Sequence, residues 1–339
     1  DHHALAMPAA APGRVYDAND GGMDVSEDGG LSWANRSNGL AATMFYDLDV
    51  SQTDGKIYGG GTQDNGTVVT ASGDPGTFFQ VLGGDGGWMI IDPQDAGHVF
   101  ASYYNFNIFR LRGGRWTEVT PDMPDEEHAS VWMVYITMDP NDSETVYVAS
   151  NRVWKTTNDG NTWKPVSDVL DATPVSAIEV APANSNFVYV GTEKGGFFRS
   201  TDAGMTWSDN LAGSILPGMI VTRIETHPKN ARIVLVTVGG RGNSHLFRSD
   251  DAGSSWTDVD GGKLPDAPLH AVVIRPDAPD TILVAGDAGI FQSLDFGKTW
   301  ASLAGNLPNT MLVDLVYQEK DKALTVATYG RSLWRAQLA

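Results

Sequence analysis

Two aspartates are the residues of this chain best placed to do chemistry. Asp64 lies in Gly60-Gly-Thr-Gln-Asp-Asn-Gly66 and Asp85 in Gly84-Asp-Gly-Gly87, and glycine-rich segments let a backbone approach a ligand closely. Two carboxyl groups about 5 to 9 Å apart can act as the acid and base of glycoside hydrolysis. Asp-Asn-Gly and Asp-Gly-Gly are also ordinary turn formers, so a purely structural role for either aspartate is the alternative.

Polar and aromatic residues in the surrounding loops are further candidates, for ligand binding rather than catalysis. Tyrosine and tryptophan rings can stack on a sugar ring, while carboxylate, amide and guanidinium groups can hydrogen-bond to its hydroxyls. The candidate ligand-binding residues are His2, Asp20, Tyr46, Gln63, Asn65, Trp88, Tyr103, Tyr104, Arg152, Arg223, Arg241, Tyr329 and Arg331. Adjacent histidines on a strand point to opposite faces, so His2 and His3 form a poor chelating pair. We expect neither a metal site nor a cofactor.

An eight-residue sequence that the chain repeats indicates which architecture holds these loops. The sequence Ser200-Thr-Asp-Ala-Gly-Met-Thr-Trp207 has close copies ending at Trp33, Trp256 and Trp300. A fifth copy, ending at Trp163, has asparagine in place of the aspartate. The tryptophans from Trp163 onward are 44, 49 and 44 residues apart. A period of about 40 to 50 residues is typical of a repeat architecture.

Each position of this octapeptide has a structural role. The aspartate accepts hydrogen bonds from backbone N–H groups and closes a tight turn, and the glycine supplies a conformation that a Cβ would resist. The tryptophan is expected to pack against the next unit. A turn that recurs in every unit is poorly suited to be a catalytic site. The structural residues of the five copies are Asp28, Trp33, Asn158, Trp163, Asp202, Trp207, Asp251, Trp256, Asp295 and Trp300.

Four strand-like segments can be read in each repeat unit, and no stretch has a long helical period. Eight units cover residues 1–339 as a single domain. The pattern predicts an all-β fold, one β-propeller of four-stranded blades, because radial repetition protects the edges of such sheets. Eight blades, the last incomplete, are expected, and seven blades are the alternative. Each octapeptide follows a third strand, so all five should lie on the face opposite Asp64, Asp85, Arg152 and Arg241.

The two ends of the chain carry a further expectation. The eighth unit shows no fourth strand after residues 332–336, and the chain begins at Asp1 without methionine. We therefore expect a fragment that lacks its natural N-terminus. Roughly 10 preceding residues, about one strand and its turn, would complete the last blade.

The octapeptide resembles the Asp-box, or BNR, repeat of sialidases, family 74 xyloglucanases and sortilin-type receptor propellers. Over the whole chain, the nearest resemblance is to bacterial BNR-repeat proteins with a sortilin-like N-terminal domain. The residues that carry it are Asp1-His-His-Ala-Leu5, Asn19-Asp-Gly-Gly22, Gly60–Gly66, Gly84–Gly87 and Ala327-Thr-Tyr-Gly-Arg331. The resemblance implies a propeller, but enzymes, receptors and assembly factors share this repeat. The Arg-Ile-Pro segment of sialidases is absent, and family 74 xyloglucanases have two propellers where this chain supplies one.

The composition argues against some classes of partner and cellular location. A net charge of −19 argues against a nucleic-acid partner, which requires clustered Lys and Arg. There is no cysteine, and no apolar run reaches the roughly 18–20 residues of a membrane helix, so membrane insertion is not expected. We predict an extracellular or periplasmic propeller that binds a glycan or protein partner at the loop face of its channel. The alternative is a xyloglucanase-like or sialidase-like glycoside hydrolase, completed by domains or subunits lost from this chain.

Overall fold

The computed structural model describes residues 1–37, 39–74, 76–128, 132–214, 216, 218–303 and 305–338. These residues form thirty strands and one four-residue helix, α1 (Asp125–His128). The strands pair antiparallel in eight sheets, six with four strands and two with three. The predicted all-β propeller class and the eight successive strand units are confirmed for the described part of the chain.

Each sheet consists of strands that follow one another in the sequence. The first four sheets contain β1 (His2–Ala6), β2 (Val15–Asn19), β3 (Gly22–Ser26) and β4 (Ala34–Asn35); β5 (Asp49–Val50), β6 (Tyr58–Thr62), β7 (Gly66–Thr70) and β8 (Phe79–Leu82); β9 (Gly86–Ile91), β10 (Val99–Tyr103), β11 (Asn107–Arg112) and β12 (Arg115–Glu118); and β13 (Tyr135–Asp139), β14 (Asp142–Ala149), β15 (Val153–Thr156) and β16 (Lys164–Pro165).

The other four sheets have the same meander order. They contain β17 (Val175–Val180), β18 (Val188–Thr192) and β19 (Phe197–Ser200); β20 (Val221–His227), β21 (Asn230–Val238), β22 (Leu246–Ser249) and β23 (Thr257–Asp258); β24 (Leu269–Ile274), β25 (Ile282–Gly286), β26 (Gly289–Ser293) and β27 (Ala301–Ser302); and β28 (Leu312–Gln318), β29 (Ala323–Thr328) and β30 (Leu333–Gln337).

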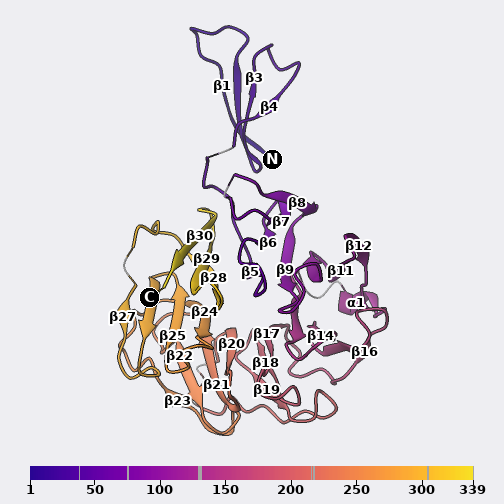
Figure 1. Cartoon of the computed structure of the whole chain (residues 1–339), viewed down its shortest axis with the longest axis vertical. Coiled ribbons are helices and arrows are strands. Elements are labelled where there is room, and N and C mark those ends of the chain that lie inside the picture. The colour runs from indigo at the N-terminus through magenta and orange to yellow at the C-terminus, as the bar shows by residue number, and fades with distance from the viewer. Residues whose placement is uncertain are drawn as a thin grey trace.

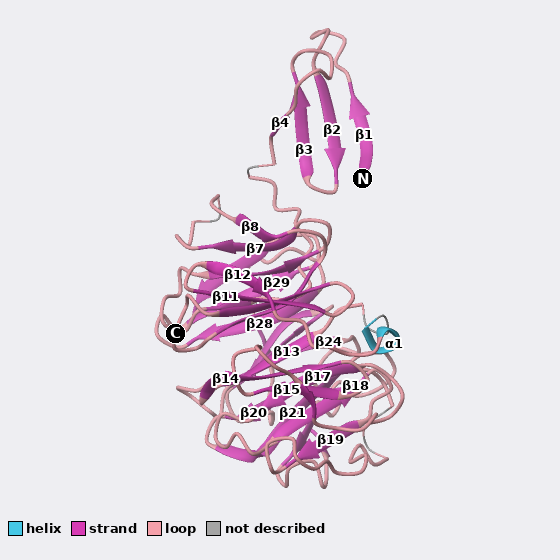
Figure 2. Cartoon of the chain, turned by 90° about the vertical axis from the view of Figure 1, so that its right-hand side faces the viewer, coloured by secondary structure: helices cyan, strands magenta, loops and turns pink. Residues whose placement is uncertain are grey.

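Seven of the eight sheets form a ring, and the first sheet stands outside it. The first strands of the seven, β5, β9, β13, β17, β20, β24 and β28, surround a common centre (Figure 1), and each packs against the next, with β28 returning to β5. The sheet β1–β4, indigo in Figure 1, projects beyond the ring, as the side view in Figure 2 also shows. The eight units thus give eight sheets, and the expected alternative of seven blades describes the ring.

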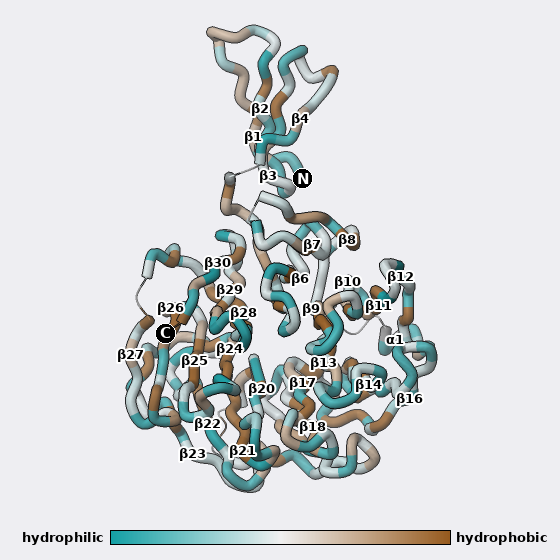
Figure 3. Tube along the Cα trace, in the orientation of Figure 1, coloured by the Kyte–Doolittle hydropathy of each residue, from teal (hydrophilic) through white to brown (hydrophobic). Residues whose placement is uncertain are grey.

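Burial separates the ring from the projecting sheet. No residue in the first strand of any ring sheet is exposed; in β13, for example, four residues out of five are buried. All five residues of β1 are exposed, although β1 holds the same position in its own sheet. The apolar core lies between neighbouring ring sheets, where Phe197, Val221 and Trp256 share one cluster. Hydrophobic residues follow the strands of the ring in Figure 3.

The octapeptide turns have the geometry that their sequence predicts. The Ser200 hydroxyl oxygen accepts the N–H of Gly204 at 2.8 Å, and the Asp202 carboxylate accepts the N–H of Thr206 at 2.8 Å and its hydroxyl at 2.6 Å. Equivalent bonds to the backbone occur in the other four copies. Gly204 and the preceding Ala203 both have positive φ, +89° and +58°, so the turn needs two left-handed residues.

The tryptophans of the four ring turns pack against the preceding sheet, not the next one. Trp207 donates its indole N–H to the backbone carbonyl of Val166, and Trp256 donates to that of Leu211, at 2.8 and 3.0 Å. Each acceptor residue also donates its own N–H to the carbonyl of the first residue of the third strand in the preceding sheet, Val153 or Phe197. Trp33 has no such acceptor: it donates to Gly30 within its own turn and is 46% exposed.

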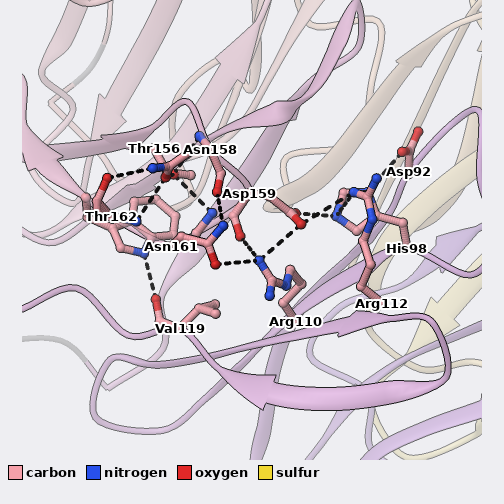
Figure 4. A network of polar contacts seen from close by, with 12 residues as sticks. Asp92, His98, Arg110, Arg112, Val119, Thr156, Asn158, Asp159, Asn161 and Thr162 are labelled. Atoms are coloured by element: carbon pink, nitrogen blue, oxygen red, sulfur yellow. Dashed lines mark hydrogen bonds and ion pairs between the residues drawn. The ribbon is translucent and has the colours of Figure 1, made fainter.

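Basic residues on third strands strengthen the same joints between sheets. Arg110 donates to the backbone carbonyl of Asp159 and, at 3.3 Å, to the side chain of Asn161 in the next octapeptide turn (Figure 4). The Asp159 carboxylate also bonds to the buried imidazole of His98 at 2.8 Å. Lys155 and Arg199 make the equivalent contacts with the carbonyls of Ala203 and Ala252.

The ring closes through contacts between residues 43–53 and the last sheet. The N–H of Phe45 donates to the carbonyl of Thr328 at 3.1 Å, and the N–H of Leu48 donates to the carboxylate of Asp314 at 3.3 Å. Side chains add a further bond, from Gln318 to the carbonyl of Gln52 at 3.2 Å. Among the described residues β30 pairs only with β29. That residues preceding Asp1 add a fourth strand there stays a prediction.

Candidate functional site

Asp64 and Asp85, the predicted carboxyl pair, come together at one end of the ring. Asp64 lies in the tight β6–β7 turn with a left-handed φ of 62°, and Asp85 lies just before β9. The Asp85 carboxylate accepts the backbone N–H of Asp64 at 2.9 Å. Gly66 makes the turn possible, because a Cβ there would lie 1.9 Å from the carbonyl oxygen of Leu82. Gly61 lets the next sheet approach, because a Cβ there would lie 1.9 Å from the carbonyl oxygen of Gly87, and the acidic loops of the two sheets can therefore meet.

The carboxyl group of Asp64 is shifted toward its protonated form. Partial desolvation raises its pKa, and the neighbouring carboxylates of Asp85 and Asp20 add to the rise. When one of two neighbouring carboxyl groups has a raised pKa, it is suited to donate a proton, and the other is suited to accept one.

Two tyrosines stand beside this pair. The rings of Tyr46 and Tyr329 lie 6.0 Å apart, and the Tyr329 hydroxyl donates to the side chain of Gln63. Burial raises the pKa of Tyr46, and Tyr329, Asp85 and Asp64 raise it further by charge. Tyr46 therefore remains a neutral hydroxyl at any physiological pH.

An aromatic stack continues the site from Asp85 outward. Tyr103 and Tyr104 have ring centroids 4.1 Å apart and a hydrogen bond of 2.7 Å between their hydroxyls. Tyr104 is stacked on Trp132, with centroids 5.3 Å apart and planes at 11°. The N–H of Tyr104 donates to the carbonyl of Asp85 at 3.3 Å. Trp132 is 56% exposed, so the stack offers an aromatic face to solvent next to the carboxyl pair.

The projecting sheet touches the ring at this same place. The side-chain amide of Asn65 donates to the backbone carbonyl of Asp20, in the β2–β3 turn, at 2.9 Å. The Asp20 carboxylate bonds to the N-terminal amino group and to His3. We call the group Asp20, Tyr46, Gln63, Asp64, Asn65, Asp85, Tyr103, Tyr104, Trp132 and Tyr329 the Asp64–Asp85 site.

The remaining predicted binding residues lie elsewhere. His2 bonds to Asp17 within the projecting sheet, and Arg152 pairs with Glu127 at 3.3 Å. Arg241 lies 3.4 Å from the carboxylate of Asp287. The exposed Arg331 donates its guanidinium N–H to the carbonyl of Gly330. These arginines bond within separate turns, so the structure does not bring them together with the carboxyl pair.

Trp88 and Arg223 belong to the central channel, where a cavity of about 170 Å³ is lined by inner strands. Trp88 lies against Tyr135, with ring centroids 3.8 Å apart, and Arg223 forms an ion pair with Asp314. The acidic residues around Arg223 come from four sheets, and the sequence interpretation missed them. They are Asp47, Asp49, Glu179, Glu225 and Asp314. Acidic positions within otherwise apolar first strands are the signal that would have found them.

These channel carboxyl groups connect successive sheets. Asp47 and Asp49 accept the N–H groups of Met89 and Ile91 in the next sheet, at 2.8 and 2.6 Å. Glu225 accepts the N–H of Ile274 at 3.0 Å. Desolvation raises the pKa of Asp49 to about 7, and it also raises the pKa values of Asp47 and Glu179. Burial thus favours the protonated form of Asp47, Asp49 and Glu179, and channel carboxyl groups join successive sheets through backbone N–H groups.

The octapeptide turns and the Asp64–Asp85 site occupy opposite ends of the strands. Asp64 precedes the third strand of its sheet, whereas each octapeptide follows the third strand of its own. No three His, Asp or Glu side chains within the described residues are grouped as a metal ion would require. The described helix is far too short to cross a membrane.

Comparisons with known proteins relate the chain to xyloglucanases. None of the known protein-family models matches the sequence. A curated xyloglucanase from Hypocrea jecorina (strain QM6a) is 28% identical over an alignment of 151 residues, and the match covers 38% of this chain and 18% of that protein. The crystal structure of a GH74 xyloglucanase from Xanthomonas campestris superposes with a TM-score of 0.69 at 16% identity. The match covers 88% of this chain and 52% of that one, so this chain spans about half of the solved structure. The chain thus shares the β-propeller fold of a GH74 xyloglucanase.

Proposed function

We propose that this propeller is a glycoside hydrolase that acts on a polysaccharide at the Asp64–Asp85 site. The observation that carries the proposal is the direct contact between the two acidic loops, with the Asp85 carboxylate bonded to the backbone of Asp64 at 2.9 Å. The similarity to xyloglucanases, which are named for a glycan substrate, supports this class over a protein-binding module.

We assign a different catalytic role to each aspartate of the site. Asp64, whose pKa is raised, is suited to donate a proton to the glycosidic oxygen as the bond to the leaving sugar breaks. Asp85, held by the Asp64 N–H, is suited to stabilise positive charge at the anomeric carbon and to accept a proton from the attacking water. The stacked rings of Tyr104 and Trp132 would hold a sugar ring beside this pair by aromatic contact.

Hydrolysis is tested with xyloglucan, other β-glucans and sialyllactose, by measuring new reducing ends. We expect product from a neutral β-glucan, and its loss in Asp64→Asn and in Asp85→Asn at an unchanged melting temperature. Glu193→Gln is the matched control, because Glu193 is an exposed acid in the corresponding turn of another sheet, between β18 and β19. Full activity in both aspartate variants would refute the assignment.

Glycan binding without hydrolysis is the second candidate, and the exposed Trp132 favours it. A ring that is 56% exposed yet stacked on Tyr104 resembles a preformed platform for a sugar. In affinity electrophoresis, retardation by a polysaccharide that disappears in Trp132→Ala, with no reducing ends formed by the parent chain, would identify a binding module.

A further inference from the structure

The joint at which the ring closes contains a pair of buried carboxyl groups. The first ring sheet supplies Asp47, just before β5, and the last sheet supplies Asp314, in β28. The two side chains hydrogen-bond to each other, and both line the channel cavity. They are 2% and 3% exposed, so bulk water does not screen the charge between them. Two carboxyl groups in contact ionise together only at a high cost, which favours a proton between them.

Asp314 has the contacts of the acceptor in this pair. It forms an ion pair with Arg223, which comes from β20. Its carboxylate also accepts the N–H of Leu315 at 2.8 Å and the N–H of Leu48 at 3.3 Å. Donors thus meet both carboxylate oxygens of Asp314, so the proton of the pair belongs on Asp47.

The surroundings of Asp47 favour its protonated form. Desolvation raises the pKa of Asp47 and the Asp314 carboxylate raises it further, whereas Arg223 and the N–H of Met89 lower it. The Met89 bond, at 2.8 Å, occupies one oxygen of Asp47, which leaves the other to donate to Asp314. Arg223 is the one basic group among the cavity-lining residues that the structure describes. The other titratable groups around the pair are acids: Asp49, Tyr135, Glu179 and Glu225.

We propose that the Asp47–Asp314 pair is a pH-dependent switch on ring closure, which joins the first and last ring sheets while Asp47 is protonated and weakens their contact when that proton is lost. With the proton in place, Asp47 donates to Asp314, and Asp314 accepts the Leu48 N–H across the joint. Loss of the proton removes the first bond and puts a second negative charge beside Asp314, against the single positive charge of Arg223. The bond from Tyr329 to Gln63 crosses the same joint, so the two sides of the Asp64–Asp85 site separate when the joint opens. The switch does not depend on what that site binds.

Amide hydrogen exchange tests the switch at single residues. The N–H of Phe45 bonds across the closing joint to the carbonyl of Thr328 at 3.1 Å. The matched control is the N–H of Val175, which makes the equivalent bond between two other sheets, to the carbonyl of Ser150 at 2.7 Å. Between about pH 5 and about pH 8 we expect the protection of Val175 relative to Phe45 to rise by up to about tenfold per pH unit, the slope for one proton released on opening. A ratio that does not change with pH overturns the proposal.

Two substitutions identify the group that carries the proton. Asp47→Asn keeps a donor toward Asp314 and an acceptor for Met89 but has no proton to lose, so the ratio should become independent of pH. Asp49→Asn is the matched control, because Asp49 lines the same cavity but bonds to Ile91, away from the closing joint. Here the ratio should keep its pH dependence. A dependence that survives in Asp47→Asn overturns the proposal.

A measurement on the parent chain covers the case in which Asp47→Asn does not fold. The carboxyl carbon of Asp47 reports its protonation through its ¹³C chemical shift. We expect Asp47 to remain protonated at about pH 5, where an ordinary aspartate with a pKa of about 3.9 is ionised. An ionised Asp47 at that pH would contradict the proposed switch.

Discussion

Replacing Trp256 by alanine should destabilise the ring far more than the same change at Trp33. Trp256 is 7% exposed, its ring meets Phe197 edge to face at 4.8 Å, and its indole N–H bonds to Leu211 at 3.0 Å. Removing a buried aromatic side chain costs about 3–5 kcal/mol through lost burial and the cavity that remains. Losing the hydrogen bond alone costs about 1 kcal/mol. Trp256→Phe should therefore retain most of the stability.

Urea unfolding followed by circular dichroism measures these differences as changes in midpoint at constant slope. Trp33→Ala should change the free energy of unfolding by no more than about 0.5 kcal/mol, as surface substitutions do. Trp207, which is only half-buried, should fall between the two. If Trp33→Ala costs as much as Trp256→Ala, then tryptophan docking between sheets does not stabilise the ring, and the reasoning fails.

Three further changes test other parts of the structure. Asp202→Ala should lower the melting temperature, whereas Asp202→Asn should not. The reason is that Asn158, the asparagine at the same position of another octapeptide, makes both bonds to Thr162. If Asp202→Ala abolished glycan binding without changing the melting temperature, a structural role would be contradicted. Gly66→Ala should unfold at a lower temperature than Gly113→Ala. Both glycines have positive φ, but only at Gly66 would a Cβ clash with a neighbouring residue, Leu82. Equal melting temperatures in the two variants would contradict this explanation. The free energy of unfolding should fall as the pH rises from about 4 to about 7. Asp49 has a pKa of about 7 in the folded state and keeps its proton over this range, whereas in the unfolded chain it has already lost that proton. Asp49→Asn should reduce this dependence in thermal scans, and an unchanged pH profile would refute it.

Sequence periodicity was sufficient to predict the strands, because each sheet is a local meander. Four strand-like segments were read in each repeat unit, and each sheet contains three or four successive strands. All five octapeptides form the expected turn. The position of the β1–β4 sheet outside the ring could not be predicted from the same periodicity. Its strands have the ring's sequence pattern, and whether a sheet joins its neighbours depends on contacts far apart in the chain, such as that of Phe45 with Thr328.

The candidate site was predictable only in part for the same reason. Asp64 and Asp85 could be paired because both lie in glycine-rich loops of adjacent units. Arg152 and Arg241 occupy loops of the same kind, but nearby acids, Glu127 and Asp287, hold them in their own turns. Side-chain partners of this kind depend on rotamer and register, which loop composition does not determine.

The closure of the ring has a consequence for how the chain acquires its fold during synthesis. Phe45 and Leu48 are each 2% exposed, yet their partners Thr328 and Asp314 are made only after roughly 270 to 280 further residues. At a translation rate of about 5–20 residues per second, that interval lasts about 15 to 60 seconds. Throughout it, the apolar face of the β5–β8 sheet has no final neighbour, so the first ring sheet to be synthesised is the one exposed longest to misassembly.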